Sequence, residues 1–445
     1  MKNSQVSKSI KQQLRDARKA SLVLSNLDNS TKNQILYDIA SKIRENLSEI
    51  MLENANDVLK ADKMFERGEL SSSFCRRVKL NELKIEQMAK NCENVAELPN
   101  PSGKLLEVTR LDEGLDLHKV SCSIGVILVI FESRPDVVIQ ISALALKSGN
   151  AVILKGGKEA YHSNRILARL IRETLKKSIN VPENSINLVE TRVEVDELVK
   201  MSSELDLIIP RGSNELVQHI QRESLVPVLG HSDGICHVYL DDDADESKSR
   251  SVTLDSKINY PAVCNAAETL LVHQKFPNIW LAEILSNMQE AGVELRACEE
   301  TIKRLKTFQN LKLKNAVLDD WETEYLDFII SIKSVNSADD AVNHINHFGS
   351  KHTDVIVTEN EELAEWFMNT VDSAGVFWNA STRFADGYRY GFGAEVGVSN
   401  GKIHARGPVG LEGLVIYKYK LYGNGQGVGN YGDGKREFIH EKTKF

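Results

Sequence analysis

Short apolar runs that alternate with helical stretches after Ser123 constrain the fold more than any other feature. GVILVIF, AVILK, INLVE and DLIIP have the length of strands, and amphipathic segments such as residues 161–177 and 213–223 lie between them. Alternating β and α units predict a parallel sheet with helices on both faces. The alternation resumes in LDFIISIKSV, ADDAVNHINHF and TDVIVTE. We therefore expect an α/β protein with two doubly wound domains.

Two further regions complete the predicted organisation. Residues 7–98 carry apolar side chains at helical spacing, and residues 100–122 read as a β-hairpin, either an oligomerisation arm or an ordinary surface hairpin. The glycine-rich stretch 423–434 is interpreted as a flexible surface loop, because too little chain follows to complete a βαβ unit. The predicted domains are a dinucleotide-binding domain of 1–99 and 123–235, a catalytic domain of 236–411, and an arm and C-terminal tail of 100–122 and 412–445.

Composition excludes several classes of protein. The net charge is -8 with scattered basic residues, which argues against a nucleic-acid partner. The longest apolar run, 125–131, is far shorter than the roughly 20 residues that span a bilayer. The basic first residues favour a plain amphipathic helix over a presequence. The 6 cysteines form no close pairs, which favours a reducing compartment, and we expect a cytoplasmic protein.

Cys264 stands in an unusual context for a structural cysteine. It lies in NYPAVCNAAETLL, between a Tyr-Pro turn and a run of small residues. Structural cysteines are usually found inside apolar strands or helices, whereas this segment is typical of a shaped loop. The placement suits a nucleophile.

Three segments at the predicted carboxyl ends of strands are candidates for binding anions, since ligands of open parallel sheets bind at that edge. Lys155 ends the strand in ILKGGKEA, where its side chain either binds a phosphate or is only exposed to solvent. Gly212 and Ser213 precede a helix in PRGSNELV, where Ser213 is either an anion ligand or a simple N-cap. Arg134 follows another strand in IFESRPDVV, and a structural salt bridge is as good an interpretation as an anion site.

Several long segments together resemble the gamma-glutamyl phosphate reductases, also called glutamate-5-semialdehyde dehydrogenases, a family of the aldehyde dehydrogenase superfamily. They are GVILVIFESRPDVV, SGNAVILKGGKEA, PRGSNELV, LGHSDGICHVYLD, NYPAVCNAAETLLVH, and FWNASTRFADGYRYGFGAEVGVS with KIHARGPVGLEGL. The resemblance covers nearly the whole chain up to the glycine-rich tail. It implies an aldehyde dehydrogenase-like fold and an NADPH-dependent reduction of L-glutamyl 5-phosphate to L-glutamate 5-semialdehyde with release of phosphate, the second step of proline biosynthesis from glutamate.

The resemblance also implies roles for individual residues. Cys264 is the nucleophile that displaces phosphate and forms a thioester. The cofactor is expected at Lys155, Gly212, Ser213 and Glu324. The substrate is expected at Arg134, His231, Asn379, Ser381, Thr382 and Arg383. Asn259 and Asn265 are candidates for stabilising the oxyanion, because Glu132-Ser133-Arg134 replaces the asparagine that oxidising relatives carry after the first strand.

One difference from the oxidising aldehyde dehydrogenases favours reduction of the thioester over its hydrolysis. Oxidising aldehyde dehydrogenases carry Glu-Leu-Gly-Gly, whose glutamate activates water, whereas this chain reads Val228-Leu229-Gly230-His231. Two rivals remain: an aldehyde-oxidising enzyme that hydrolyses its thioester, and a catalytically silent scaffold. His344, His347 and His352 lack an acid or cysteine at ligand spacing, so no metal is expected. The expected partners are a glutamate 5-kinase and further copies of the chain, as a dimer or tetramer.

Overall fold

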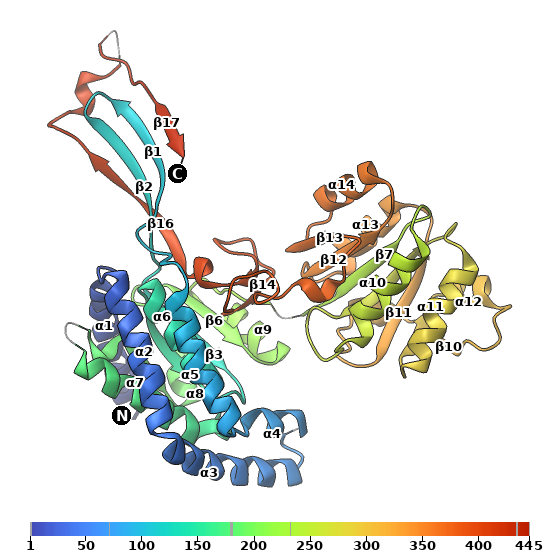
Figure 1. Ribbon diagram of the computed structural model, residues 1–445, viewed down its shortest axis with the longest axis horizontal. Coiled ribbons are helices and arrows are strands. Elements are labelled where there is room, and N and C mark those ends of the chain that lie inside the picture. The colour runs from blue at the N-terminus through green and yellow to red at the C-terminus, as the bar shows by residue number, and fades with distance from the viewer. Residues whose placement is uncertain (1, 71, 179–180, 232, 433–434, 445) are drawn as a thin grey trace. The chain divides into compact units, whose positions relative to one another are not determined.

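The computed structural model describes residues 2–70, 72–178, 181–231, 233–432 and 435–444, which divide into two compact units (Figure 1). Unit 1 comprises 1–230, 393–397 and 409–445, and unit 2 comprises 231–392 and 398–408. The division after Gly230 comes a few residues before the predicted boundary at 235, and residues 393–397 and 409–411 return to unit 1 instead of staying with the catalytic domain. The functions assigned to these domains stay predictions.

The first hundred residues form the predicted helical layer. Helix α2 begins after Asp28, whose Oδ1 accepts a hydrogen bond from the Thr31 N–H at 2.7 Å. Asp28 is therefore the N-cap of α2, and it has the extended backbone that an N-cap requires. The helices of this layer are α1 (Lys2–Leu24), α2 (Asn29–Glu45), α3 (Leu47–Glu66), α4 (Ser72–Val78) and α5 (Glu82–Glu97).

A four-stranded parallel sheet forms the centre of unit 1, in the order β5-β4-β3-β6. Its strands are β3 (Val126–Phe131), β4 (Ala151–Lys155), β5 (Ile186–Val189) and β6 (Leu207–Arg211). Every residue of β3 is buried, as expected for a strand covered on both faces. The helices that alternate with these strands are α6 (Asp136–Ser148), α7 (Tyr161–Lys177), α8 (Arg192–Leu198) and α9 (Asn214–Glu223). Helix α7 has the predicted bounds.

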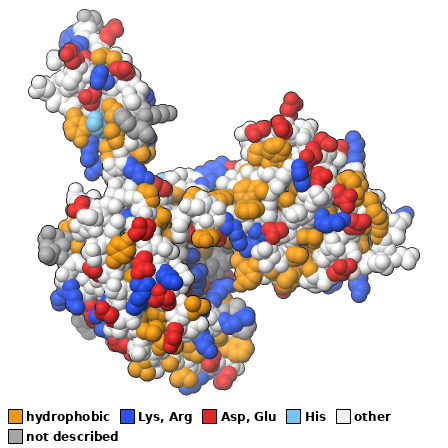
Figure 2. Space-filling view, in the orientation of Figure 1, with side chains coloured by type: hydrophobic (Ala, Val, Ile, Leu, Met, Phe, Trp, Pro, Cys, Tyr) orange, Lys and Arg blue, Asp and Glu red, His pale blue; other side chains and the backbone are white. Residues whose placement is uncertain are grey.

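The predicted hairpin is present, and the C-terminal segment extends it. Strands β1 (Leu105–Asp112) and β2 (Leu115–Ser123) pair with β16 (Val415–Tyr422) and β17 (Glu441–Lys444) in the order β16-β2-β1-β17. Tyr431 donates a hydrogen bond to Asp112, and Gln426 donates to the carbonyls of Glu113 and Gly114. Residues 423–432 form a largely exposed connection after β16, as predicted for a surface loop, and these hydrogen bonds attach it to the end of β1 and the turn before β2. Its flexibility stays a prediction. Figure 2 shows hydrophobic side chains at the surface of this sheet.

Unit 2 is built on a seven-stranded parallel sheet in the order β10-β9-β11-β8-β7-β12-β13. Its strands are β7 (Cys236–Leu240), β8 (Ala267–His273), β9 (Glu294–Ala297), β10 (Leu313–Asn315), β11 (Ile329–Val335), β12 (Thr353–Val357) and β13 (Gly375–Trp378). The helices are α10 (Glu246–Ile258), α11 (Asn278–Glu290), α12 (Glu299–Leu305), α13 (Ala338–Phe348) and α14 (Glu361–Thr370). Two short strands, β14 (Gly397–Ser399) and β15 (Gly407–Val409), pair with each other.

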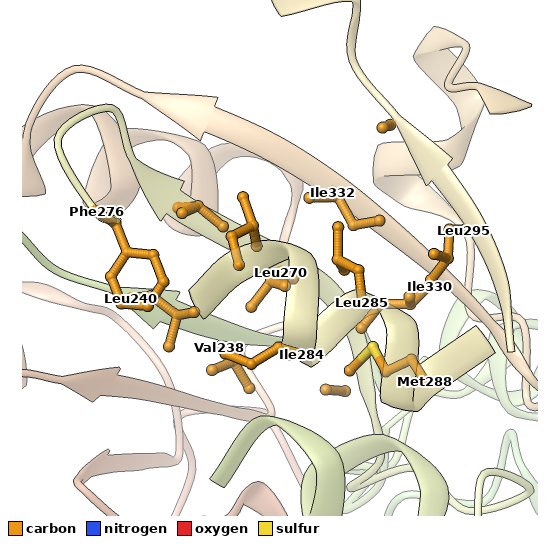
Figure 3. Close-up of a cluster of buried hydrophobic side chains, with 14 of the residues drawn as sticks. Val238, Leu240, Leu270, Phe276, Ile284, Leu285, Met288, Leu295, Ile330 and Ile332 are labelled. Carbon is orange, nitrogen blue, oxygen red and sulfur yellow. The ribbon is translucent and has the colours of Figure 1, made fainter. Parts of the chain in front are cut away.

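Side chains alternate across the strands of this sheet to fill two cores. Val238 and Leu270 pack with Leu285 and Met288 of α11 on one face (Figure 3), while Tyr239 packs with residues of α13 and α14 on the other. A sheet buried on both faces is rigid, and loops at its edges can hold reactive groups in fixed positions. Within the described ranges of the chain, no helix is both long and apolar enough to span a membrane.

Candidate active site

Cys264 lies in the loop between α10 and β8, just before the amino ends of β7 and β8. Its backbone is tightly enclosed, because a Cβ added to Gly234 would lie 2.1 Å from the Cys264 carbonyl oxygen. The Cys236 thiol donates to that same carbonyl at 3.3 Å. Burial raises the pKa of the Cys236 thiol well above its ordinary value, so Cys236 acts as a fixed neutral donor. The loop is therefore held at Cys264, as a nucleophile requires.

Two histidines from distant segments lie beside the Cys264 thiol. One ligand atom from each of His231, Cys264 and His352 lies within 4.8 Å of the other two. The histidine rings meet edge to face, with centroids 5.2 Å apart. His231 Nδ1 contacts the Val398 carbonyl at 3.1 Å, and His352 Nδ1 contacts the Thr353 hydroxyl at 2.9 Å. Burial lowers the pKa of His352 to about 3, so its ring is neutral at physiological pH.

The Asn-Ala-Ser-Thr-Arg segment packs against the same loop. Asn265 Nδ2 donates to the Ala385 carbonyl at 2.9 Å, and the Thr382 N–H donates to Ser256 Oγ of α10 at 3.1 Å. Arg383 is only 7% exposed, and its Nε has no hydrogen-bond partner among the described residues. Burial, followed by the nearby Arg389, lowers the pKa of Arg383, whereas Asp255 and Cys264 raise it. The buried guanidinium and the Cys264 thiol thus interact electrostatically.

A buried ion pair joins the two segments that flank the Cys264 loop. Lys257 of α10 and Glu268 of β8, on either side of the loop, are both fully buried and pair at 2.6 Å. Glu324 accepts a hydrogen bond from the Gly234 N–H at 2.9 Å. Burial raises the pKa of Glu268 and of Glu324 to about 7 in each case. The family resemblance assigned Glu324 to the cofactor. Its hydrogen bond connects it to Gly234, which packs against Cys264.

Three predicted site residues have side chains engaged elsewhere. Asn379, at a positive φ of 53°, exchanges two hydrogen bonds with the backbone of Thr358. Asn259 donates to Asp255 within the end of α10. Arg134 forms an ion pair with Asp136 at 2.7 Å, which is the salt bridge that the sequence left open. Their roles toward substrate or oxyanion stay predictions. Ser381 caps the segment by accepting from the Arg383 N–H.

The predicted cofactor residues of unit 1 line one cleft of about 560 Å³ at the carboxyl ends of the strands. Lys155 and Ser213 both border it, together with Lys158 and Arg192. Burial lowers the pKa of Lys155, and its Nζ donates to the Gly156 carbonyl at 2.6 Å. Lysine and arginine side chains at this edge offer contacts to a phosphorylated ligand, although five carboxylates also line the cleft.

Glu132 borders the same cleft and occupies the helix start. Its Oε2 accepts from the Ser213 N–H at 2.8 Å, and a Cβ on Gly212 would lie 2.5 Å from that oxygen. Gly212 therefore allows an acceptor to approach the start of α9 closely, as a phosphate oxygen would. A pyrophosphate bound at this helix start would replace the contact from Glu132.

The structure adds site residues that the sequence did not single out. His352 was considered only within its own segment, and Cys236, Lys257 and Glu268 were not considered at all. These residues are brought together by pairing of strands that are far apart in the chain. Arg192 carried a weak signal, because it begins a helix after β5, at the same edge as Lys155.

Comparisons with known proteins agree with this architecture. Residues 3–301 match the model of the aldehyde dehydrogenase family. The solved glyceraldehyde-3-phosphate dehydrogenase of Methanocaldococcus jannaschii, complexed with NADP, has the same fold, at 17% identity and a TM-score of 0.62 over 94% of this chain and 95% of that one. The chain is a member of the aldehyde dehydrogenase family, and the predicted fold is confirmed.

Similar sequences and a similar crystal structure show which group within the aldehyde dehydrogenase family this chain belongs to. The gamma-glutamyl phosphate reductase of Methanococcoides burtonii is 47% identical, over 97% of each chain. That of Pelotomaculum thermopropionicum is 48% identical over 96% of each. The crystal structure of the Thermotoga maritima gamma-glutamyl phosphate reductase has a TM-score of 0.89 and 39% identity, over 94% of this chain and 99% of that chain. Within the family, this chain belongs to the gamma-glutamyl phosphate reductases, which are oxidoreductases.

Proposed function

We propose that this protein reduces L-glutamyl 5-phosphate to L-glutamate 5-semialdehyde with NADPH and releases phosphate, as the second step of proline biosynthesis. The observation that carries the proposal is the placement of Cys264, which lies on a fixed backbone beside His231 and His352 and interacts electrostatically with the buried Arg383. A nucleophile surrounded by polar groups of this kind suits acyl transfer.

Cys264 performs the chemical step that the protein itself supplies. Its thiolate attacks the acyl carbon, the bond from that carbon to the phosphate oxygen breaks, and a thioester remains on the sulfur. One ring nitrogen of His231 and one of His352 lie within 4.8 Å of the sulfur, but burial lowers the pKa of His352 to about 3 and makes that ring too weak a base to hold the thiol proton. Val228 stands where oxidising relatives carry a glutamate that activates water, so the thioester is preserved for reduction.

Arg383 is the group best suited to hold the glutamyl carboxylate. Its guanidinium is buried and offers planar donors that match a carboxylate in a bidentate manner. Burial without a full set of partners is costly, and a bound carboxylate would relieve that cost. Ser381 and Thr382 position this segment through Ser256 of α10, and the Thr382 hydroxyl is buried without a partner among the described residues.

The cleft of unit 1 fits the phosphates of NADPH. Lys155, Lys158 and Arg192 supply positive charge, and Gly212 and Ser213 supply the helix start. Direct contacts from these cations favour the extra phosphate that distinguishes NADPH from NADH, despite the carboxylates that also line the cleft. When bound, NADPH supplies the hydride that reduces the thioester carbon.

The partners follow from the chemistry and from the arm sheet. An acyl phosphate is short-lived in water, so a glutamate 5-kinase that hands it over is the fitting partner in the cytoplasm. Tyr417, Tyr419 and Leu421 share one face of β16 and are each more than half exposed. A second copy of the chain covering this face would form an oligomer, and Leu421→Lys would then lower the mass measured by sedimentation.

Phosphate dependence of the reverse reaction tests the proposed function. We expect oxidation of L-glutamate 5-semialdehyde by NADP to be negligible without phosphate and to rise to saturation as phosphate is added. Phosphate is required because it must accept the acyl group from Cys264. A full rate in phosphate-free buffer would instead show hydrolysis of the thioester, as in an oxidising aldehyde dehydrogenase. Absence of any NADP-linked turnover would favour a silent scaffold.

A further inference from the structure

The described residues of unit 2 bring two imidazoles and one thiol together at the candidate nucleophile. His231 precedes β7, Cys264 precedes β8 and His352 precedes β12, so three separate segments meet at one edge of the sheet. Their ligand atoms lie within 4.8 Å of one another. A tetrahedral zinc ion, with bonds of about 2.3 Å to sulfur and about 2.0 Å to nitrogen, needs its ligands about 3.5 Å apart. Small side-chain rotations would close the difference.

The orientation of both histidines leaves the correct nitrogen for a metal. His231 Nδ1 lies 3.1 Å from the Val398 carbonyl, which can only accept, so Nδ1 carries a hydrogen and Nε2 is the ring nitrogen that a metal would use. His352 Nδ1 is engaged by the Thr353 hydroxyl at 2.9 Å. A contact from one ring nitrogen to a backbone or side-chain oxygen is the usual support for metal-binding histidines.

His352 Nε2 provides a second, independent observation. The residue is 1% exposed, and its Nε2 is a buried nitrogen without a hydrogen-bond partner among the described residues. A buried polar atom left without a partner costs free energy, and a ligand in the cluster would satisfy it.

We propose that His231, Cys264 and His352 form a reversible inhibitory site for Zn²⁺. Thiolate and imidazole are the ligands that zinc prefers, and a fourth position would remain for solvent. Binding replaces the proton of the Cys264 thiol by the metal and releases that proton. The sulfur lone pair is then committed to zinc and is not available to attack an acyl carbon. The inhibition, but not the binding, rests on the proposed role of Cys264.

The sequence expectation of no metal considered histidines within one segment only. His344 contacts the ring of His237, and His347 lies against Phe348, so neither shares the cluster with His352. The ligands found here come from residues 231 and 264, which no spacing rule connects to residue 352. The inferred zinc is an inhibitor at the nucleophile and not a cofactor of the reaction.

Metal binding and activity are measured separately to test this inference. The full chain, reduced and freed of metal, is titrated with Zn²⁺ against a chromophoric chelator, and separately with Co²⁺ to detect a thiolate charge-transfer band and tetrahedral d–d bands. We expect one tight site per chain. Cys264→Ser and His352→Asn should weaken zinc binding by at least about 100-fold, more than loss of an outer partner causes. His347→Ala, an exposed histidine outside the cluster, should bind zinc like the parent.

Phosphate-dependent turnover of the parent, measured first without metal, separates failure of the proposed function from failure of the zinc site. We expect activity to fall in proportion to zinc bound and to return on addition of a chelator. His231→Ala, at a half-buried position, provides a second ligand variant if His352→Asn unfolds early. Unchanged zinc affinity in both histidine variants, or no thiolate band with Co²⁺, would overturn the site. Tight zinc binding that leaves turnover intact would overturn the inhibition.

Discussion

The two units place their candidate functional residues at opposite edges of their sheets. In unit 1, Lys155 and Ser213 lie at the carboxyl ends of the strands, where helices begin. In unit 2, Cys264 and His352 lie at the amino ends, where α10 and α13 have just ended. Helix starts present N–H groups and partial positive charge, whereas helix ends present carbonyls and partial negative charge. The carboxyl edge of the unit 1 sheet therefore attracts phosphates through its backbone alone. The amino edge of the unit 2 sheet needs charged side chains to do so.

This difference explains how each site is built. The cleft of unit 1 relies on backbone groups and several cations, so its binding energy is shared. The cluster of unit 2 must counter the helix ends with side chains from distant segments, above all the buried Arg383 near the thiol. We therefore expect single substitutions at the thiol cluster of unit 2 to have large effects and substitutions in the cleft of unit 1 to have smaller ones.

Cys264→Ala should have the largest effect, because it removes the only atom proposed to form the thioester. We expect kcat to fall by at least about 10⁴-fold with little change in the thermal unfolding temperature. Steady-state turnover and calorimetry check both parts. Cys298→Ser is the matched control, because Cys298 is the N-cap of α12 and serine also caps helices well. Substantial activity in Cys264→Ala would remove the basis of the comparison.

Gly234→Ala should come next, because its Cβ would lie 2.1 Å from the Cys264 carbonyl oxygen. The loop must shift by about 1 Å, and a displacement of that size costs roughly 100-fold in rate. We expect kcat to fall while NADPH binding, measured by fluorescence, is unchanged. Gly401→Ala is the control, since its nearest atom would be 3.6 Å away. Equal kcat values in the two variants would show that the loop is less rigid than described.

The sequence predicted the cleft of unit 1 more completely than the Cys264 cluster of unit 2, because the cluster is assembled from distant segments. Lys155 and Ser213 could be assigned to one edge because strand and helix order alone places them there. Cys264 could be singled out from its own segment. The association of His231, His352 and Glu268 with it depends on the order β8-β7-β12, and strand order is set by long-range packing that no local pattern records. The pairing of β16 with β2, across nearly three hundred residues of chain, was not predicted for a similar reason.

Arg192→Ala tests the shared binding expected in unit 1. Arg192 and Lys155 both line the cleft, so each can contact a bound phosphate. We expect KM for NADPH to rise about tenfold, KM for NADH to stay level and kcat to change little. Lys200→Ala, an exposed position not among the residues lining the cleft, should match the parent. A loss of kcat would show that unit 1 is as sensitive to single changes as unit 2.

Glu324→Gln has the smallest expected effect. It tests whether cofactor binding is confined to unit 1, because Glu324 belongs to unit 2 but is predicted to contact the cofactor. Burial raises its pKa to about 7, so the carboxyl is neutral below that pH and ionised above it. An ionised carboxylate is the stronger acceptor for ribose hydroxyls, so kcat/KM for NADPH should fall about three- to fivefold from pH 8 to pH 6.

The glutamine variant should be low and independent of pH over this range, because an amide does not ionise. Measurement of kcat/KM for NADPH at saturating acyl phosphate, across the pH range for both proteins, decides the point. Parallel pH profiles would confine the role of Glu324 to its hydrogen bond with the Gly234 N–H. Cofactor recognition would then lie with unit 1 alone, and the contrast between the two units would become sharper.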